Sequence, residues 1–308
     1  MDPVGPVAAI DCGTNSTRLL VVGADGIALE RLTRITRLGA GVDATGILAP
    51  EAVDRCLSVL RGYRQVMDKL DVVRGRLAAT SAARDASNGA EFLRAAGEVT
   101  GIEPELLVGT DEGRLSMAGA VSDLDHDKGP FLVLDIGGGS TELVTGSGPD
   151  DPGLSVVSLQ VGCVRITERF LTSDPPTATE LREAEAMVDG LLEQAIADHP
   201  RFLAAHCLVG LAGTVTTLAS LHLGLDVYDR DRIHHAVLTA GDVYDWYWTL
   251  ASEVTAARLD RAGMVPGRED VIVGGALILS AVMTRFGFDE CLVSEADILD
   301  GMAAGLLR

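Results

Sequence analysis

The sequence contains few aromatic residues and no long apolar run. Aromatic residues make up 4% of the 308 residues, so the hydrophobic cores must consist mainly of Ala, Val, Leu and Ile. An exposed stacking platform for single-stranded nucleic acid is therefore not expected. The segment Met1–Pro6 carries no basic residue, and Asp11 interrupts the short apolar run that follows it. We expect neither a signal peptide nor a membrane-spanning helix, and we expect a cytoplasmic protein.

Cysteine and histidine are scarce and lack the spacing of metal ligands. The five cysteines are scattered and include no C-x-x-C pair, which argues against a disulfide framework and a zinc knuckle. Of the six histidines only His234 and His235 are adjacent. We expect these two to form a surface or loop pair rather than a metal site. The Walker A pattern G-x-x-x-x-G-K-[ST] is also absent, so a P-loop nucleotide site is excluded.

Basic residues are outnumbered by acidic ones. The chain has 25 Lys and Arg against 45 Asp and Glu, a net charge of −20. Such a charge repels nucleic acids and anionic membranes, and we expect neither as a partner. Any polyanionic ligand would need a local basic cluster or metal ions to offset this repulsion.

Predicted strands and helices alternate along the chain, which indicates an α/β fold, and the length suggests two domains. The polar, acidic segment Ser122–Pro130 is the best candidate for a linker. Strands are predicted at 7–10, 19–22, 77–81, 106–109, 131–134, 154–159, 207–211 and 291–293, and helices at 50–70, 88–100, 111–121, 164–170, 179–199, 239–253 and 270–286.

One pattern occurs twice. Residues 11–19 and 135–143 both read D-x-G-x-x-S-T-x-L, and each copy lies between two apolar runs. The offset of 124 residues is about the length of one domain. Two copies at this spacing favour a duplicated strand–turn–strand hairpin, one in each domain, over two unrelated tight turns.

The repeated pattern has the chemistry of a phosphate-binding loop. Glycine allows backbone N–H groups to approach an anion, successive N–H groups form an anion-binding nest, and Ser and Thr hydroxyls add donors. The aspartate at the start of each copy is suited to a hard cation instead. A third glycine loop, Gly210–Thr214, follows the predicted strand at 207–211 and predicts either another phosphate contact or a plain strand-to-helix turn.

Together these motifs resemble the exopolyphosphatase / guanosine pentaphosphate phosphatase (Ppx/GppA) family of the actin-like ATPase superfamily. The resemblance runs over essentially the whole chain. It rests on seven motifs in the order of the family, at residues 11–18, 79–88, 109–114, 135–142, 158–168, 213–218 and 266–270. It implies two RNase H-like domains with a cleft between them. We expect the first at 1–121, with about 295–308 packing back on it, and the second at 122–294.

The resemblance also implies site residues. Glu112 matches the catalytic glutamate of the family's E-E-A-R motif, which here reads Asp111-Glu112-Gly113-Arg114. Asp135, Asp11 and Glu142 are the expected ligands of Mg²⁺, with Mn²⁺ as the alternative metal. Arg165 and Arg268 are weaker candidates for contact with a chain-like substrate. The expected phosphate-binding residues are Gly13, Thr14, Asn15, Ser16, Arg18, Ser81, Arg84, Gly137, Gly138, Gly139, Ser140, Gly213 and Thr214.

The implied activity is an exopolyphosphatase that releases terminal orthophosphate from inorganic polyphosphate by attack of water. The alternatives are a guanosine pentaphosphate phosphohydrolase of the stringent response and a non-catalytic sensor of polyphosphate or guanosine phosphates. A kinase or ATPase of the same superfamily is a further alternative, because fold alone does not fix the reaction. A homodimer is compatible with the sequence, but no sequence feature establishes it.

Overall fold

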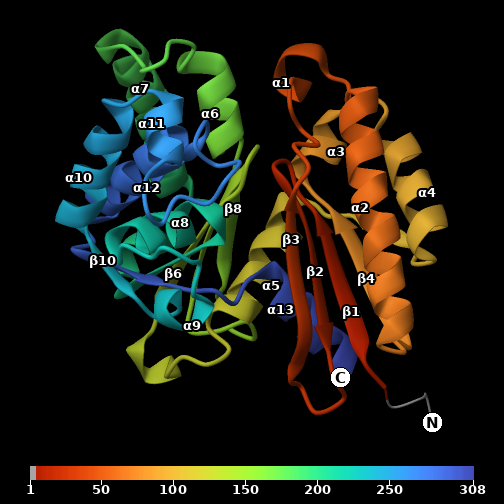
Figure 1. Ribbon diagram of the computed structural model, residues 1–308. Helices are drawn as coiled ribbons and strands as arrows, with labels where there is room; N and C mark the ends of the chain where they lie inside the picture. Colours follow the sequence, from red (N-terminus) through yellow and green to blue (C-terminus); the bar gives the residue numbers. More distant parts are fainter. Residues whose placement is uncertain (1–4) are drawn as a thin grey trace. The chain divides into compact units, whose positions relative to one another are not determined.

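A computed structural model describes residues 5–308, so Met1–Val4 of the segment expected to lack a signal peptide lie outside the described residues. The chain forms two compact units, one of residues 1–119 with 298–308 and the other of residues 120–297. It passes between them at Gly119–Ala120, inside helix α5, and again at Asp297–Ile298 (Figure 1). The segment 122–130 therefore belongs to the second unit.

Unit 1 is built on a five-stranded mixed sheet of order β3-β2-β1-β4-β5. β1 pairs antiparallel with β2 and parallel with β4, β2 pairs antiparallel with β3, and β4 pairs parallel with β5. The strands are β1 (Val7–Cys12), β2 (Ser16–Val22), β3 (Ala28–Ile35), β4 (Arg74–Ala79) and β5 (Pro104–Leu106).

Both faces of this sheet are covered by helices, because successive side chains of a strand point to opposite faces. Ala8, Ile10 and Cys12 of β1 pack in the core that α2 and α4 share, whereas Val7 and Ala9 pack in the core that includes α13. The helices of unit 1 are α1 (Val42–Thr45), α2 (Pro50–Lys69), α3 (Ser81–Asp85), α4 (Gly89–Thr100), α5 (Gly109–Ala120) and α13 (Ile298–Leu307).

Unit 2 repeats the same strand order with one added strand. Its sheet runs β8-β7-β6-β9-β11-β10, and the first five strands match β3-β2-β1-β4-β5 in order and direction. This is the RNase H-like arrangement, so the predicted α/β fold with two such domains is confirmed. The strands are β6 (Phe131–Ile136), β7 (Thr141–Gly146), β8 (Ser155–Leu159), β9 (Cys207–Leu211), β10 (Val237–Thr239) and β11 (Glu290–Val293).

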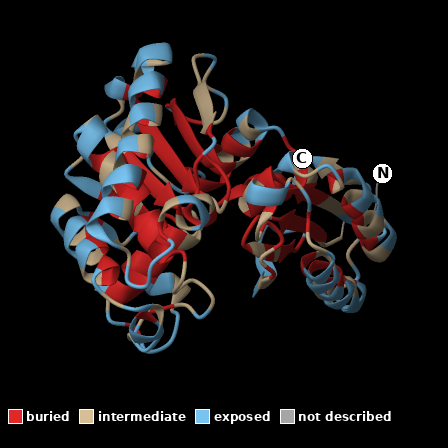
Figure 2. Cartoon of the chain, turned by 90° about the horizontal axis from the view of Figure 1, so that it is seen from above, coloured by how far each residue is buried: buried red, intermediate tan, exposed pale blue. Residues whose placement is uncertain are grey.

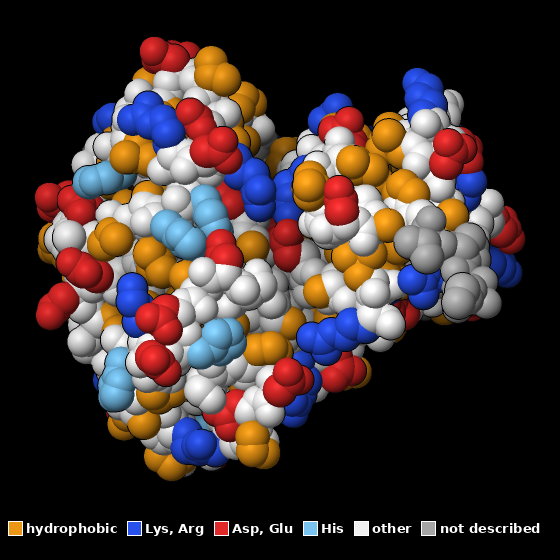
Figure 3. Space-filling model, turned by 90° about the horizontal axis from the view of Figure 1, so that it is seen from below, with side chains coloured by type: hydrophobic (Ala, Val, Ile, Leu, Met, Phe, Trp, Pro, Cys, Tyr) orange, Lys and Arg blue, Asp and Glu red, His pale blue; other side chains and the backbone are white. Residues whose placement is uncertain are grey.

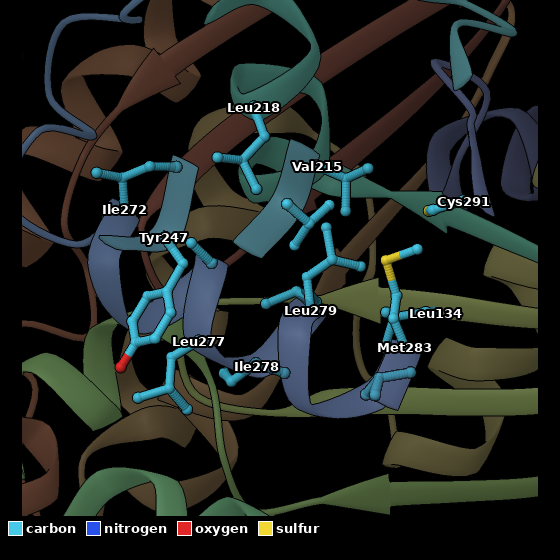
Figure 4. Packing of buried hydrophobic residues seen from close by; sticks show 14 of the residues in the cluster. Leu134, Val215, Leu218, Tyr247, Ile272, Leu277, Ile278, Leu279, Met283 and Cys291 are labelled. Atoms are coloured by element: carbon cyan, nitrogen blue, oxygen red, sulfur yellow. The ribbon is translucent and has the colours of Figure 1, made fainter. Parts of the chain in front are cut away.

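The core of unit 2 is centred on α12, which is buried along most of its length and packs against α6, α7, α8 and α10. Figure 4 shows Leu277, Ile278 and Met283 of this helix among side chains of β6 and α8. In Figure 2 the central strands are red, the edge strands are partly tan, and the outer faces of the helices are pale blue. The helical segments are η1 (His126–Lys128), α6 (Cys163–Phe170), α7 (Ala178–Asp198), η2 (Pro200–Ala204), α8 (Ala212–His222), α9 (Arg230–Ile233), α10 (Ala240–Ala251), α11 (Thr255–Leu259) and α12 (Ile272–Phe286).

The structure differs from the sequence prediction in several places. The strand predicted at 106–109 is wrong, because pairing with β4 ends at Leu106 and Gly109 already begins α5. The segment after β4, expected as a loop, forms the short helix α3. The edge strands β3 and β10 were not predicted, since the partly exposed, charged β3 lacks apolar alternation and β10 has only three residues. No helix in the described part of the chain is long and apolar enough to span a membrane.

Candidate functional site

The two copies of the repeated motif fold into the same turn. In unit 1 the N–H of Gly13 donates to the carbonyl of Ser16 over 3.0 Å, closing the hairpin between β1 and β2. In unit 2 the N–H of Gly137 donates to the carbonyl of Ser140 over the same distance, between β6 and β7. The duplicated hairpin predicted from the sequence is therefore present in both units.

In both turns a following segment binds the loop carbonyls. The amides of Thr36 and Arg37 donate to the carbonyl of Asn15, and that of Gly39 donates to the carbonyl of Thr14. In unit 2 the amides of Val164 and Arg165, at the start of α6, donate to the carbonyl of Gly138.

The carbonyls of both loops are thus hydrogen-bonded, whereas several of the loop amides are not bonded within the described part of the chain. Within residues 5–308 the N–H groups of Thr14, Asn15, Gly138 and Gly139 donate to no acceptor, and the buried Nδ2 of Asn15 also has no hydrogen-bond partner. Buried donors are normally satisfied. Consecutive amides of this kind make an anion-binding nest, so the geometry of both turns suits a phosphate.

The residues opposite the two aspartates differ between the units. Asp11 is the cross-strand partner of Arg18, and its Oδ2 accepts from both Nε (3.0 Å) and Nη2 (2.7 Å) of that arginine. Asp135 occupies the equivalent place in unit 2, where its cross-strand partner is Glu142. Arg18, which we expected to bind phosphate, is therefore hydrogen-bonded to Asp11 in the structure.

The carboxylates of unit 2 form an acidic pair inside the sheet. Asp135 is 6% and Glu142 1% exposed. Oε1 of Glu142 accepts from Ser158 Oγ over 2.7 Å, which fixes its position against β8. Like charges directly opposite each other in a sheet are destabilising. Two buried carboxylates of this kind form an oxygen donor set that suits a divalent cation such as Mg²⁺.

The remaining predicted residues of unit 1 come together around α3. Oγ of Ser81, the first residue of α3, lies 2.8 Å from Thr14 Oγ1 of the glycine turn. Arg84, one turn further along α3, donates from Nη1 to the carbonyl of Leu107 over 2.8 Å. Its Nη1 is 3.7 Å from Oε2 of Glu112, which lies in the first turn of α5 and is 8% exposed.

Arg84 presents an additional donor at this place. Its Nη2 is buried and has no hydrogen-bond partner among residues 5–308. An arginine with one nitrogen fixed by the protein and another available is suited to a phosphate oxygen. Thr14, Asn15, Ser81, Arg84 and Glu112 therefore form one candidate anion site within unit 1.

The third glycine loop is a strained strand-to-helix turn. Ala212, at the start of α8, has φ +65, a left-handed conformation that is unusual for a residue other than glycine. A Cβ on Gly213 would lie 1.5 Å from Nη1 of Arg268, so the guanidinium of Arg268 covers the position of the missing side chain. Thr214 is buried beside it. Among residues 5–308 no side chain caps the first turn of α8, which leaves its N-terminal amides to other acceptors.

The cysteines next to the glycine turns are not activated. A hydrogen bond with Cys56, together with burial, raises the pKa of Cys12 well above its usual value. Burial raises the pKa of Cys163, at the start of α6. A thiol nucleophile acts as its thiolate. These two residues are therefore poorly suited to attack a phosphoryl group.

His234 and His235, predicted as a surface or loop pair, lie in the loop between α9 and β10. His235 has φ +63, and the two imidazole rings stack with centroids 3.9 Å apart. Their Nε2 atoms lie 2.8 and 3.6 Å from Oδ2 of Asp123. However, Nδ1 of His234 accepts from the amide of Glu295, so its Nε2 carries the proton and donates to Asp123. In this tautomer Nε2 of His234 has no lone pair for a metal, and it binds Asp123 instead.

Sequence reasoning missed the segment 36–39 that supports the turn of unit 1. A Cβ on Gly39 would lie 2.4 Å from Cγ2 of Thr14, which shows how tightly this segment packs on the loop. The available signal was the pair of glycines at 39 and 41 directly after a charged run, which is typical of a constrained loop.

Residues 22–308 match the family described as the Ppx/GppA phosphatase family. The chain belongs to this family. It is 43% identical to exopolyphosphatase 2 of Mycobacterium tuberculosis over 97% of this chain and 98% of the relative. A crystal structure of an exopolyphosphatase-like protein has a TM-score of 0.93 and 37% identity, covering 98% of this chain and 99% of the other. That of an exopolyphosphatase from Cytophaga hutchinsonii has a TM-score of 0.88 and 26% identity, covering 98% and 97%.

Membership of the Ppx/GppA family confirms the resemblance seen in the sequence and shows that the protein is a phosphatase. The roles of individual residues stay predictions. The structure brings five of them together in unit 1 and joins Asp135 with Glu142 in unit 2.

Proposed function

We propose that this phosphatase is an exopolyphosphatase, which removes terminal orthophosphate from inorganic polyphosphate by Mg²⁺-dependent attack of water. The names of the M. tuberculosis and C. hutchinsonii relatives support this substrate class. The observation that carries the proposal is the pair of Arg84 and Glu112. It places a hydrogen-bond donor that could bind phosphate, Nη2 of Arg84, beside a buried carboxylate.

In the proposed reaction Glu112 orients the attacking water and accepts its proton. The oxygen of that water bonds to the terminal phosphorus, the bridging P–O bond breaks, and the shortened polyphosphate leaves. Phosphoryl transfer needs little covalent chemistry from a protein, because positioning and charge neutralisation do most of the catalysis. A carboxylate that serves only the helix dipole would have no need of an arginine at 3.7 Å.

The phosphate groups of the substrate would be held by the donors that lack protein acceptors. We assign this role to the amides of Thr14 and Asn15, the side chain of Asn15 and Nη2 of Arg84 in unit 1. In unit 2 we assign it to the amides of Gly138 and Gly139. Ser81, Gly213 and Thr214 remain further candidates from the sequence.

The metal would be held by Asp135 and Glu142. Both carboxylates are buried and opposite each other, and carboxylate oxygens are the ligands that Mg²⁺ and Mn²⁺ prefer. Bound there, the ion would offset the charge of these carboxylates and of phosphate oxygens. Asp11 is the weaker ligand candidate, because Arg18 already offsets its charge.

The net charge of −20 favours a short substrate and keeps guanosine pentaphosphate as a second candidate. Unit 2 holds 28 of the 45 acidic residues but only 11 of the 25 basic ones. On the face shown in Figure 3, the described acidic and basic side chains form small mixed groups, and no continuous basic track of these residues crosses that face. A long polyanion normally requires such a track.

The test measures orthophosphate release with Mg²⁺ from tripolyphosphate, long-chain polyphosphate, guanosine pentaphosphate and ATP. Glu112→Gln removes the proposed base while retaining the shape of the side chain. Asp111→Asn is the matched control, since Asp111 is the neighbouring carboxylate in the first turn of α5. We expect Glu112→Gln to lose activity by about a hundredfold or more and Asp111→Asn to retain it.

Each outcome decides between the candidates. Turnover of tripolyphosphate that requires Glu112 and stops with EDTA supports the proposal. Turnover of guanosine pentaphosphate alone retains the mechanism and replaces the substrate. Binding without release of phosphate supports the sensor, and release that does not need Glu112 contradicts the assigned base.

A further inference from the structure

Arg37 stands in a backbone conformation that favours glycine. Its φ is +49, in the left-handed region that residues with a Cβ avoid. Such strain persists only where the surrounding structure enforces it, and it gathers at functional sites. The chain places glycine at Gly41 and Gly46, which also have positive φ, so the arginine at position 37 calls for a separate reason.

The backbone of Arg37 is held by the glycine turn of unit 1. The amides of Thr36 and Arg37 converge on the carbonyl of Asn15, over 3.1 and 2.9 Å. On either side Thr36 is 1% exposed and Leu38 is fully buried in the core beneath the sheet. Nε of Arg55 also donates to the carbonyl of Thr36 over 3.1 Å. This anchoring explains the left-handed turn, which glycine would satisfy equally well.

Unlike glycine, arginine adds a guanidinium to the segment whose backbone contacts the glycine turn. The amide of Arg37 donates to the carbonyl of Asn15, whose own N–H and Nδ2 have no acceptor within the described residues. The side chain of Arg37 is only partly exposed. An arginine is long enough to reach a ligand bound at a neighbouring residue, and its planar fork matches phosphate oxygens.

We propose that the guanidinium of Arg37 binds non-bridging oxygens of the substrate phosphates held at the Gly13–Asn15 turn, as a second arginine beside Arg84. The inference rests on the proposed function for the identity of the ligand. It also places more of the cationic contacts in unit 1, which has 14 of the 25 basic residues against 17 of the 45 acidic ones.

The test uses Arg37→Gly, which removes the side chain in a backbone conformation that suits glycine. Asp71→Gly is the matched control, because Asp71 has φ +51 in the same unit and lies in an exposed turn. Arg37→Lys separates the guanidinium fork from the charge. The readouts are kcat and KM for tripolyphosphate with Mg²⁺, the Tm, and recovery of activity on addition of guanidinium ion.

We expect Arg37→Gly to lower kcat/KM by about 10- to 100-fold, the range for hydrogen bonds to a charged group, while its Tm stays close to that of the wild type. Arg37→Lys should recover little of this loss, added guanidinium should recover part of it, and Asp71→Gly should match the wild type in activity. An Arg37→Gly variant with wild-type kcat/KM would overturn the inference. So would a loss that follows a fall in Tm and does not respond to guanidinium.

Failure of the proposed function can be told apart from failure of this inference. If the wild type releases no orthophosphate from tripolyphosphate, the proposed function fails, and Arg37 is judged by the rise in Tm that tripolyphosphate causes. A rise in the wild type that Arg37→Gly loses supports phosphate binding by Arg37. An equal rise in both proteins, or none in the wild type, overturns it.

Discussion

Nη1 of Arg84 lies 3.7 Å from Oε2 of Glu112. The two residues belong to different helices, α3 before strand β5 and α5 after it in the sequence. The same Nη1 donates to the carbonyl of Leu107, at the end of the segment that leads into α5. Nη1 of Arg84 thus fixes the segment before α5 through Leu107, and it also offsets the charge of Glu112. The other terminal nitrogen, Nη2, has no partner within residues 5–308.

Replacement of Arg84 should therefore reduce activity more than stability. We expect Arg84→Met to lower kcat/KM by about 30-fold or more, since loss of one member of a buried charged contact costs about 2–5 kcal/mol. Arg84→Lys should recover only part of the activity, because a lysine lacks the two-pronged donor. Steady-state kinetics with tripolyphosphate measure the effect, and Tm checks the fold. A threefold change or less for Arg84→Met would contradict the assigned role.

Gly162 should be intolerant of even one methyl group. A Cβ there would lie 2.4 Å from the carbonyl oxygen of Gly138, inside the glycine turn of unit 2. The φ of Gly162 is −153, which alanine adopts readily, so the effect of Gly162→Ala is purely steric. We expect a loss of about 1–3 kcal/mol in stability, as for overpacked cores, and a loss of activity because the amides of Gly138 and Gly139 move.

Gly190→Ala is the control for this prediction. Gly190 lies inside α7, and a Cβ there would meet no atom within 4 Å. Alanine should stabilise the helix by up to about 1 kcal/mol and leave activity unchanged. Urea unfolding and phosphate release measure both variants. Wild-type activity in Gly162→Ala would show that the turn does not depend on this contact.

The sequence was sufficient to predict the two hairpins, because their pattern is local and occurs twice. The same pattern also contained the cross-strand pairs, since the first and eighth residues of each copy face each other across the turn. Sequence reasoning assigned Arg18 to phosphate, which stays a prediction, and in the structure Arg18 also pairs with Asp11. The position equivalent to Arg18 in unit 2 is Glu142, and this exchange of sign makes unit 2 the better place for a cation.

Contacts between distant segments could not be predicted in this way. Arg84 and Glu112 meet because β4 and β5 are neighbours in the sheet, which no local pattern reveals. Asp123 and His234 are separated by 111 residues and come together through the loops after α5 and α9. Arg37 carried no recognisable signal, because its importance depends on a left-handed φ that the sequence does not record.

Arg258 should be essential for the stability of unit 2. It is 3% exposed, and its guanidinium donates to the carbonyls of Leu250, Glu253 and Glu269. Burial lowers the pKa of Arg258. Arg258→Met would leave three carbonyls without their charged donor, and we expect a loss of about 3 kcal/mol or more. Both tryptophans of the chain lie in α10 of the same unit, so tryptophan fluorescence during urea unfolding reports on this unit.

Arg285→Met serves as the comparison for Arg258. Arg285 pairs with Asp189 on the surface, with side-chain exposures of 36% and 43%. Exposed ion pairs contribute about 0–1 kcal/mol. The two variants should therefore differ clearly in their unfolding midpoints. Similar midpoints would mean that the carbonyls around Arg258 find other donors.

The N-terminus of α7 should make stability depend on acidic pH. Hydrogen bonds from the backbone of Thr177 and the hydroxyl of Thr172 lower the pKa of Glu180 to about 2, against 4.5 for a free glutamate. Because the folded-state pKa is depressed, the stabilisation is complete above pH 4.5 and is lost as the pH falls from there towards 2. Glu180→Gln should thus lower the urea midpoint at neutral pH, and its difference from the wild type should narrow below pH 4.5. Thr179→Ala, beside the capping box, is the control. A difference that stays constant across this range would show that the charge of Glu180 contributes nothing to the cap.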